Sequence, residues 1–329
     1  MSKSLTDGFG RIATDLRVSV TDRCDLRCTY CMPEEGLSWT PPDEVLSFDE
    51  IERLVSVAMT LGVRTVRLTG GEPLMRARLP DLVRRLSGVG LDDLSMTTNG
   101  TTLARHAKAL KTAGLCRVNV SLDSLERHRF TAMTRRDRIE QVLEGISVAA
   151  EVGLLPVKVN CVVLRGVNDD EVVAFAEFAR STGCQIRFIE YLPLDADHAW
   201  TSADVVPSSE VLASIAGVYQ IVPDNSITGQ PATVYRFADG APGSVGVIAS
   251  VTEPFCDSCD RIRLSADGQL RSCLFSSDET DLRSLLRVGA TDEVITHAML
   301  STVAQKQKGH GIGTSLFIRP RRSMSMIGG

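Results

Sequence analysis

The chain has 329 residues, of which 43% are hydrophobic and 23% charged, and its formal net charge is −5 at pH 7. This length and apolar fraction suffice for one large α/β unit or two ordinary domains with a sizeable core. The negative charge argues against nucleic-acid binding as the main function. The N-terminal segment lacks a secretory apolar stretch, and no segment approaches the roughly 20 apolar residues of a membrane span. A soluble protein with no nucleic acid and no membrane contact is expected, with a cytoplasmic location.

Short β-rich runs alternate with amphipathic segments over residues 1–191. Ser47 and Glu50 form a capping box that predicts the start of the first helix, and Gly114 and Gly183 are typical helix ends. Consecutive βα units indicate a parallel sheet, which the pattern alone allows to be either an open doubly wound layer or a curled barrel. The predicted strands cover 16–20, 63–68, 93–97, 117–121, 157–163 and 185–190.

The alternation of β-rich runs and amphipathic segments ends at residue 191. Residues 192–329 contain stretches rich in Pro, Gly, Asp and Ser, with short strand-like runs at 244–251 and 261–264. We therefore expect a second, C-terminal α+β region over 192–329, following an N-terminal βα region over 1–191.

Three cysteines, Cys24, Cys28 and Cys31, follow the first predicted strand with the spacing CxxxCxxC. Loops at the C-terminal ends of parallel strands are where α/β folds place their sites. A structural zinc site would need a fourth ligand, and the nearest histidine in the sequence is His106. A 4Fe-4S cluster has four irons, so a trio of cysteines would leave one iron free to bind something else.

A second trio, Cys256, Cys259 and Cys273, lies in the C-terminal region. The turn Asp267-Gly268 predicts a hairpin that would bring Cys259 and Cys273 together. A zinc ribbon is the alternative, but it would normally supply a fourth ligand. The other cysteines lie in or beside apolar runs and are expected to be ordinary core residues: Cys116, Cys161 and Cys184.

Cationic residues interrupt four of the predicted strands, which we expect to be buried on both faces: Arg17, Arg67, Lys158 and Arg187. An unpaired buried charge costs several kcal/mol, so each needs a counter-charge. Internal carboxylates such as Glu190 or Asp123 are one solution. Arg261 and Arg263 add two more cations on one strand face, and the whole set favours a polyanionic ligand such as a triphosphate.

The first trio, with Tyr30 before its last cysteine, resembles the signature of radical S-adenosylmethionine (SAM) enzymes. Gly70-Gly71-Glu72-Pro73 after the second strand is similar to the turn with which that family holds the methionyl amine. The resemblance implies a 4Fe-4S cluster that binds SAM at its open iron. It also implies contacts to SAM or its neighbourhood from residues at strand ends and on the cysteine loop: Tyr30, Gly71, Thr97 and Ser121.

Both trios, the cations, the segment 187–190 and the terminus Gly328-Gly329 together resemble the GTP 3′,8-cyclases, from about residue 11 to residue 329. This implies an incomplete (βα)6 TIM-like barrel closed by the C-terminal region, with two 4Fe-4S clusters facing one cavity. The implied reaction abstracts the ribose 3′ hydrogen of GTP and joins C3′ to guanine C8. It is the first step of molybdenum cofactor biosynthesis.

The resemblance also implies residue roles. Substrate contacts would come from Arg17, Arg67, Thr97, Lys158, Arg187, Arg261, Ile262 and Arg263. Gly328 and Gly329 would enter the cavity and take part in catalysis, together with Arg17, Arg261, Arg263 and the first trio. Leu192 departs from the family, whose members commonly have a methionine near the adenosyl group, although an apolar contact would survive.

The implied partners are a low-potential electron donor and the downstream cyclic pyranopterin monophosphate synthase, with the chain acting as a monomer or homodimer. Two other functions would explain the cysteines but not the whole pattern of residues. A peptide-modifying radical enzyme with an auxiliary cluster would need no nest of cations, and a non-catalytic metal-binding scaffold would not explain the Gly-Gly-Glu-Pro turn.

Overall fold

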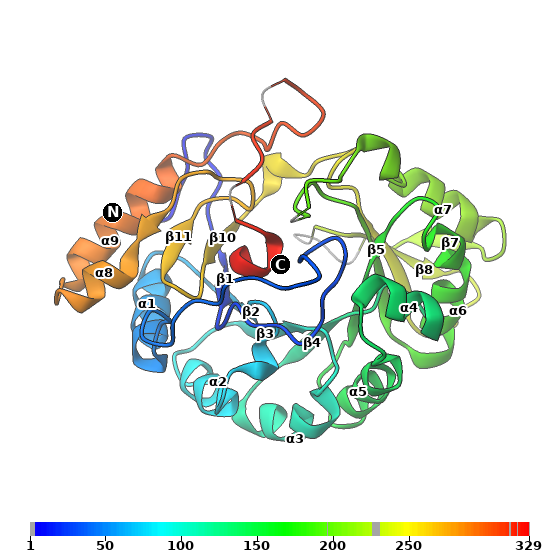
Figure 1. Ribbon diagram of the computed structural model, residues 1–329, viewed down its shortest axis with the longest axis horizontal. Helices are drawn as coiled ribbons and strands as arrows, with labels where there is room; N and C mark the ends of the chain where they lie inside the picture. The colour runs from blue at the N-terminus through cyan, green and yellow to red at the C-terminus, as the bar shows by residue number, and fades with distance from the viewer. Residues whose placement is uncertain (1–3, 196, 226–230, 316, 321, 329) are drawn as a thin grey trace.

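The structure is a computed structural model that describes residues 4–195, 197–225, 231–315, 317–320 and 322–328. In this part of the chain twelve strands form one sheet, in the order β12-β11-β10-β1-β2-β3-β4-β5-β6-β9-β8-β7. The central strands from β10 to β9 run parallel, and the outer pairs are antiparallel. Strands β1 to β6 follow one another in sequence order without the reversal of a doubly wound sheet. The sheet accordingly curls into an arc with helices outside it (Figure 1).

The first six strands confirm the sequence-based prediction, and the largest difference is at β2, predicted at 63–68. The strands are β1 Asp15–Ser19, β2 Thr65–Thr69, β3 Asp93–Thr98, β4 Arg117–Ser121, β5 Lys158–Val163, β6 Gln185–Glu190, β7 Ile221–Pro223, β8 Thr233–Phe237, β9 Ser244–Ile248, β10 Arg261–Leu264, β11 Gln269–Arg271 and β12 Thr280–Asp281.

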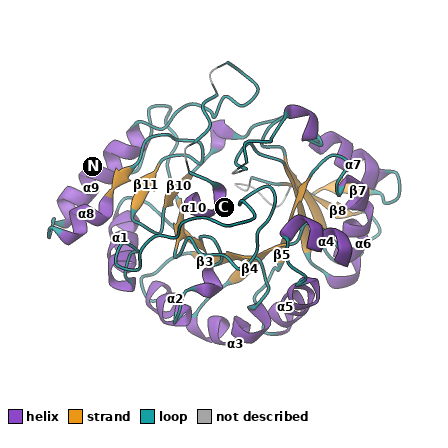
Figure 2. Ribbon diagram, in the orientation of Figure 1, coloured by secondary structure: helices purple, strands orange, loops and turns teal. Residues whose placement is uncertain are grey.

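The helices alternate with the strands along the first half of the chain (Figure 2). Ser47 caps α1 through a complete capping box with Glu50, and Gly114 and Gly183 adopt the left-handed conformation after α3 and α6, as predicted. The α-helices are α1 Phe48–Thr60, α2 Leu79–Ser87, α3 Leu103–Ala113, α4 Arg127–Thr134, α5 Ile139–Glu151, α6 Val172–Thr182, α7 Ser208–Ala216, α8 Leu282–Arg287, α9 Asp292–Ala304 and α10 Met324–Ile327.

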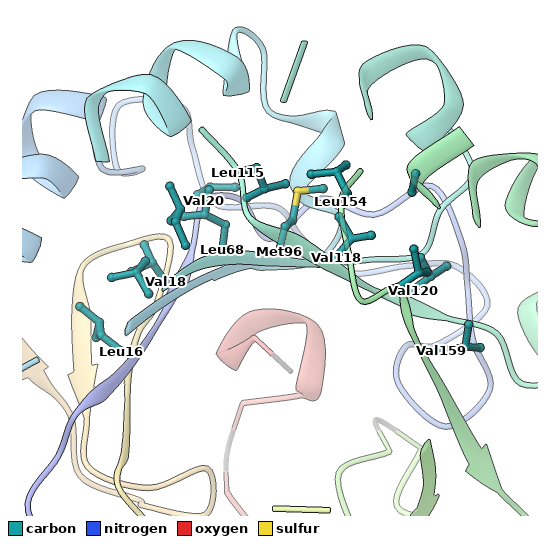
Figure 3. Packing of buried hydrophobic residues seen from close by; sticks show 14 of the residues in the cluster. Leu16, Val18, Val20, Leu68, Met96, Leu115, Val118, Val120, Leu154 and Val159 are labelled. Atoms are coloured by element: carbon teal, nitrogen blue, oxygen red, sulfur yellow. The ribbon is translucent and has the colours of Figure 1, made fainter. Parts of the chain in front are cut away.

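The two faces of the parallel strands differ. Even-numbered residues of β1 and β2 are apolar and fully buried, whereas Arg17 and Arg67 face the other way and line a cavity. Arg17, Lys158 and Arg187 are buried, as expected for strands buried on both faces, but the concave face of the curled sheet surrounds a cavity and only the convex face packs on helices. Figure 3 shows this outer layer, which includes Leu16, Val18, Leu68, Met96, Val118, Val120 and Val159.

The C-terminal region extends the same sheet at both of its ends. Strand β9 pairs with β6 and strand β10 pairs with β1, so the two regions that we propose, 1–191 and 192–329, share one sheet. The last helix, α10, lies inside the arc (Figure 1). In the described residues, no helix is both long enough and apolar enough to cross a membrane.

Candidate active site

Cys24, Cys28 and Cys31 lie on the loop that follows β1, and all three line one pocket inside the arc. The loop docks on the end of α4 through a hydrogen bond from the Arg27 amide to the carbonyl of Thr134 (3.0 Å). Burial raises the pKa of each of the three thiols, to about 12 for Cys31. Ligation of iron by thiolates would therefore release protons at this loop.

Gly70 and Gly71 allow the backbone of the turn after β2 to contact the backbone of the segment that leads into the cysteine loop. A Cβ on Gly70 would lie 2.1 Å from the carbonyl oxygen of Thr21, and one on Gly71 would lie 2.3 Å from that of Arg23. The amide of Gly71 donates to Thr21 O (2.8 Å). Glycine is required here because two backbones touch, in addition to the ligand approach expected from the sequence.

Two buried carboxylates organise the polar groups around this pocket. Asp123 accepts hydrogen bonds from the Tyr30 hydroxyl (2.6 Å) and from the amide of Val162 (2.8 Å), and burial raises its pKa to about 6. Glu72 accepts from the amide of Asn99 (2.6 Å), and burial raises its pKa to about 7. Tyr30, which the sequence assigned to the cofactor, is thus fixed in orientation by a partner whose role the sequence did not indicate.

The second trio comes together around the β10–β11 hairpin, as predicted. Cys256 lies on a short 3-10 helix, Cys259 precedes β10, and Cys273 follows β11. The hairpin turns at Gly268, whose φ is +81°. All three cysteines line a second pocket inside the arc.

Cys259 differs electrostatically from its neighbours. Its sulfur accepts hydrogen bonds from Arg261 Nη2 and from Lys306 Nζ, each at 3.5 Å. Burial opposes its ionisation, but Arg261 and Lys306 outweigh that effect and lower the pKa to about 7. Burial raises the pKa of Cys256 instead.

Five arginines from four strands line the second pocket: Arg17, Arg67, Arg187, Arg261 and Arg263. Arg263, Arg17 and Arg67 are direct register partners across β10, β1 and β2. Like charges opposite each other in a ladder are destabilising, so an anion between them would be bound favourably.

These arginines have few partners within the protein. The nearest carboxylate oxygen to Arg17 is Asp15 Oδ2, at 3.9 Å, and Arg187 donates to Asn119 Oδ1 at 3.4 Å. Within the described part of the chain, the Nε atoms of Arg17 and Arg187 are buried without a hydrogen-bond partner. Burial, followed by neighbouring positive charges, holds the pKa of both guanidinium groups well below its ordinary value.

The two carboxylates considered as internal counter-charges are used elsewhere. Glu190 accepts from the amides of Ser208 (3.0 Å) and Val251 (2.7 Å), and Asp123 holds Tyr30. The cation set therefore fits an external anion better than a set of structural ion pairs.

The two pockets meet inside the arc and share four lining residues: Thr97, Asn160, Ile189 and Met324. Gly71, Ser121 and Tyr30, for which the resemblance implies contacts to SAM, line the part with the first trio. Leu192 lines the part with the second trio. One cavity thus has a cysteine trio in each part and cations around it.

Two predicted substrate residues do not line this cavity. The side chain of Ile262 is fully buried in the hydrophobic core, because its neighbours Arg261 and Arg263 take the inner face of β10. Any contact with a ligand would therefore come from its backbone. Lys158 is buried among the cations, and burial and then Arg187 lower its pKa to about 6.

The chain's C-terminal tail enters the cavity. Met324 lines both pockets, and the carbonyl of Gly328 accepts a hydrogen bond from Arg263 Nη1. Gly328 has a φ of +82°, and a Cβ there would lie 2.2 Å from Ser19 Oγ. Gly329, also predicted to act in the cavity, lies outside the described residues.

Ion pairs that the sequence did not predict hold this tail. Arg322 contacts Asp267 (2.9 Å) and Glu279 (2.8 Å), and Arg319 contacts Asp195 (2.9 Å). The arginines were visible in the sequence, but their partners lie far away along the chain. Only the fold brings them together.

In the part of the chain that the structure describes, no group of three or more His, Cys, Asp or Glu is arranged to hold a metal ion. The cavity is nevertheless suited to two iron–sulfur clusters, because three cysteine thiols line each of its two parts and thiolates are the usual ligands of such clusters.

Comparison with protein families assigns both regions of the chain. Residues 18–179 match the Radical SAM superfamily, and residues 184–312 match Molybdenum Cofactor Synthesis C. A GTP 3′,8-cyclase from Mycobacterium sp. (strain KMS) is 50% identical over 328 residues, covering 99% of this chain and 93% of the relative. One from Streptomyces coelicolor is also 50% identical, with 96% of the relative covered.

Solved structures share the fold. Streptococcus suis SuiB matches with a TM-score of 0.63 at 14% identity, covering 92% of this chain and 68% of SuiB. The structure of SuiB bound to S-adenosylmethionine matches with a TM-score of 0.61 at 13% identity, covering 88% of this chain and 68% of that one. At this identity the likeness concerns the fold alone.

Proposed function

The chain belongs to the GTP 3′,8-cyclase family of radical SAM enzymes, and we propose that it converts GTP to 3′,8-cyclo-7,8-dihydro-GTP. This is the first step of molybdenum cofactor biosynthesis, in agreement with the match of its C-terminal region. The cofactors are SAM and two 4Fe-4S clusters.

One observation of the structure carries the proposal most directly. Two cysteine trios and five buried or half-buried arginines surround a single cavity inside the sheet. Among the described residues Arg67 and Arg187 form no ion pair with a carboxylate, and Arg17 has only Asp15 at 3.9 Å, so a triphosphate would offer the negative charge that they need. Bidentate guanidinium contacts to phosphate are strong.

The residues in the part of the cavity with the first trio would bind the cluster and SAM. The first trio would hold the SAM cluster, with Gly71 and Ser121 beside the methionyl group and Tyr30 held in place by Asp123. When bound, cluster and SAM supply the 5′-deoxyadenosyl radical that abstracts the ribose 3′ hydrogen.

The second trio would hold the other cluster near the base, between Arg261 and Arg263. Thr97, which lines both parts of the cavity, would contact the sugar between them, and Leu192 would make an apolar contact to the adenosyl group. The arginines fix the phosphates, and a fixed ribose is what a directed hydrogen abstraction needs.

The proposal includes partners. Reductive cleavage of SAM needs a low-potential electron donor, and the cyclised nucleotide would pass to cyclic pyranopterin monophosphate synthase. The chain would act as a monomer or a homodimer.

Anaerobic reconstitution tests the function. The protein should bind about eight irons with matching sulfide, as two 4Fe-4S clusters require. With reductant, SAM and GTP it should form deoxyadenosine and the cyclised nucleotide in equal amounts, and ATP in place of GTP should give little product. Stoichiometric zinc without sulfide, or clusters without any GTP-dependent product, would refute the proposal.

A further inference from the structure

A buried lysine lies behind the second cysteine trio. Lys306 follows the end of α9 and is 4% exposed. Its Nζ donates to the carbonyl oxygen of Cys259 (2.9 Å), to the sulfur of Cys259 (3.5 Å) and to the carbonyl oxygen of Arg261 (2.9 Å). Among the described residues that line the two pockets Lys306 does not appear, so it stands behind the cysteines and away from the substrate.

In the part of the chain that the structure describes, the side chain of Lys306 forms hydrogen bonds with no carboxylate. All three donations go to one short segment, Cys259–Arg261. A buried cation without a counter-charge destabilises the folded protein. The group within its reach that would carry negative charge as a cluster ligand is the Cys259 sulfur, which Lys306 Nζ and Arg261 Nη2 both approach to 3.5 Å.

The segment that follows Lys306 also wraps the trio. The backbone of His310 forms a hydrogen bond with the Cys256 thiol, and a Cβ on Gly309 would lie 3.8 Å from the same sulfur. Arg11 ties this segment to the trio, since its guanidinium donates to Cys256 O (2.6 Å) and to Gln307 O (2.6 Å). The residues directly after Lys306 are therefore fixed against the second trio.

We propose that Lys306 is a positioning residue for the second cluster, which holds the Cys259–Arg261 segment and raises the reduction potential of that cluster. The inference rests on the proposed function, which places a 4Fe-4S cluster on the second trio. Taking up one electron from a low-potential donor makes such a cluster more negative by one charge. A fixed buried cation stabilises that reduced form, and hydrogen bonds to the ligand sulfur act in the same direction.

The test uses the full-length chain with Cys24, Cys28 and Cys31 replaced by Ala, so that the second cluster is the only one present. Its midpoint potential is measured by a dithionite titration followed by EPR. Lys306→Met and Lys306→Gln should shift the potential to more negative values, and Lys306→Arg should stay near the parent. Lys308 is exposed and two residues away, so Lys308→Met is the matched control and should leave the potential unchanged.

Lys306→Gln keeps a neutral donor for the backbone carbonyls, so it remains informative if Lys306→Met fails to assemble a cluster. An unchanged or more positive potential in Lys306→Gln would overturn the inference, as would a Lys306→Arg shift equal to that of Lys306→Gln. A parent protein with no iron and sulfide on the second trio would overturn the proposed function as well. A parent with its cluster and an unshifted Lys306→Gln would overturn this inference alone.

Discussion

Gly328→Ala should uncouple radical formation from product formation. Gly328 has a φ of +82°, and an added Cβ would lie 2.2 Å from Ser19 Oγ and 2.8 Å from Thr69 Cγ2. The left-handed conformation costs a non-glycine residue about 1–2 kcal/mol. Displacing Ser19 would also break its hydrogen bond to the carbonyl of Ile327, worth about 0.5–1.5 kcal/mol.

Together these costs amount to about 1.5–3.5 kcal/mol against the inserted tail, or roughly a 10- to 400-fold lower ratio of inserted to withdrawn tail. Both cysteine trios lie on other segments of the chain, so iron and sulfide contents should stay unchanged. Deoxyadenosine and cyclised nucleotide are measured in one anaerobic reaction with one reductant. We expect product to fall relative to deoxyadenosine.

Gly313→Ala is the matched control for this substitution. Gly313 has a φ of +81°, but nothing lies within 4 Å of an added Cβ, so the variant carries the backbone strain without the clash. It should retain wild-type coupling. If Gly328→Ala gives wild-type yields of both compounds, the tail has no role in the reaction and behaves as an ordinary, poorly ordered chain end.

Three further predictions concern the clusters and the cations. Replacing either trio with Ala should lower the iron content from about eight to about four per chain, and loss of all iron from one replacement would contradict two independent sites. Arg187→Ala should weaken GTP binding by about 1.5–3 kcal/mol in calorimetry, with little loss of thermal stability, whereas the exposed Arg127→Ala should change neither. Unchanged affinity with a large loss of stability would make Arg187 structural. Lys158, whose pKa is lowered to about 6, is mostly neutral at pH 7 in the empty site, and a bound triphosphate should raise that pKa. GTP binding at pH 7 should therefore take up a proton, so the measured binding enthalpy should depend on the ionisation enthalpy of the buffer. A binding enthalpy of the wild type that does not depend on the buffer would contradict the assignment. So would a buffer dependence that remains in Lys158→Met.

The sequence by itself was sufficient for the local elements. Strand and helix positions follow from periodicities of two and 3.6 residues, and the caps at Ser47, Gly114 and Gly183 follow from the chemistry of single turns. The two cysteine trios could be recognised as ligand sets because their spacing is short and lies within one loop or hairpin. These are properties of neighbours along the chain. The structure confirms the strands and caps and places each trio in one part of the cavity, but Cys116, expected in the core, is exposed.

The resemblance supplied most of the site residues, but it did not supply their environments. The glycines after β2 were expected to approach a ligand, and the structure adds the backbone of Thr21 and Arg23 as a reason for glycine. Ile262 was expected at the substrate, yet its side chain faces the core. The four residues of β10 do not indicate by themselves which of their side chains will lie on the concave face of the sheet.

Tertiary structure alone decided which strand face surrounds the cavity and which groups meet there. Register placed Arg263, Arg17 and Arg67 side by side on three strands, although Arg263 is distant in sequence. It also brought Lys306 to Cys259 and Arg322 to Asp267. Such contacts depend on how the sheet curls and on where the last segment of the chain returns. Both are set by long-range packing, for which no short segment of sequence carries a signal.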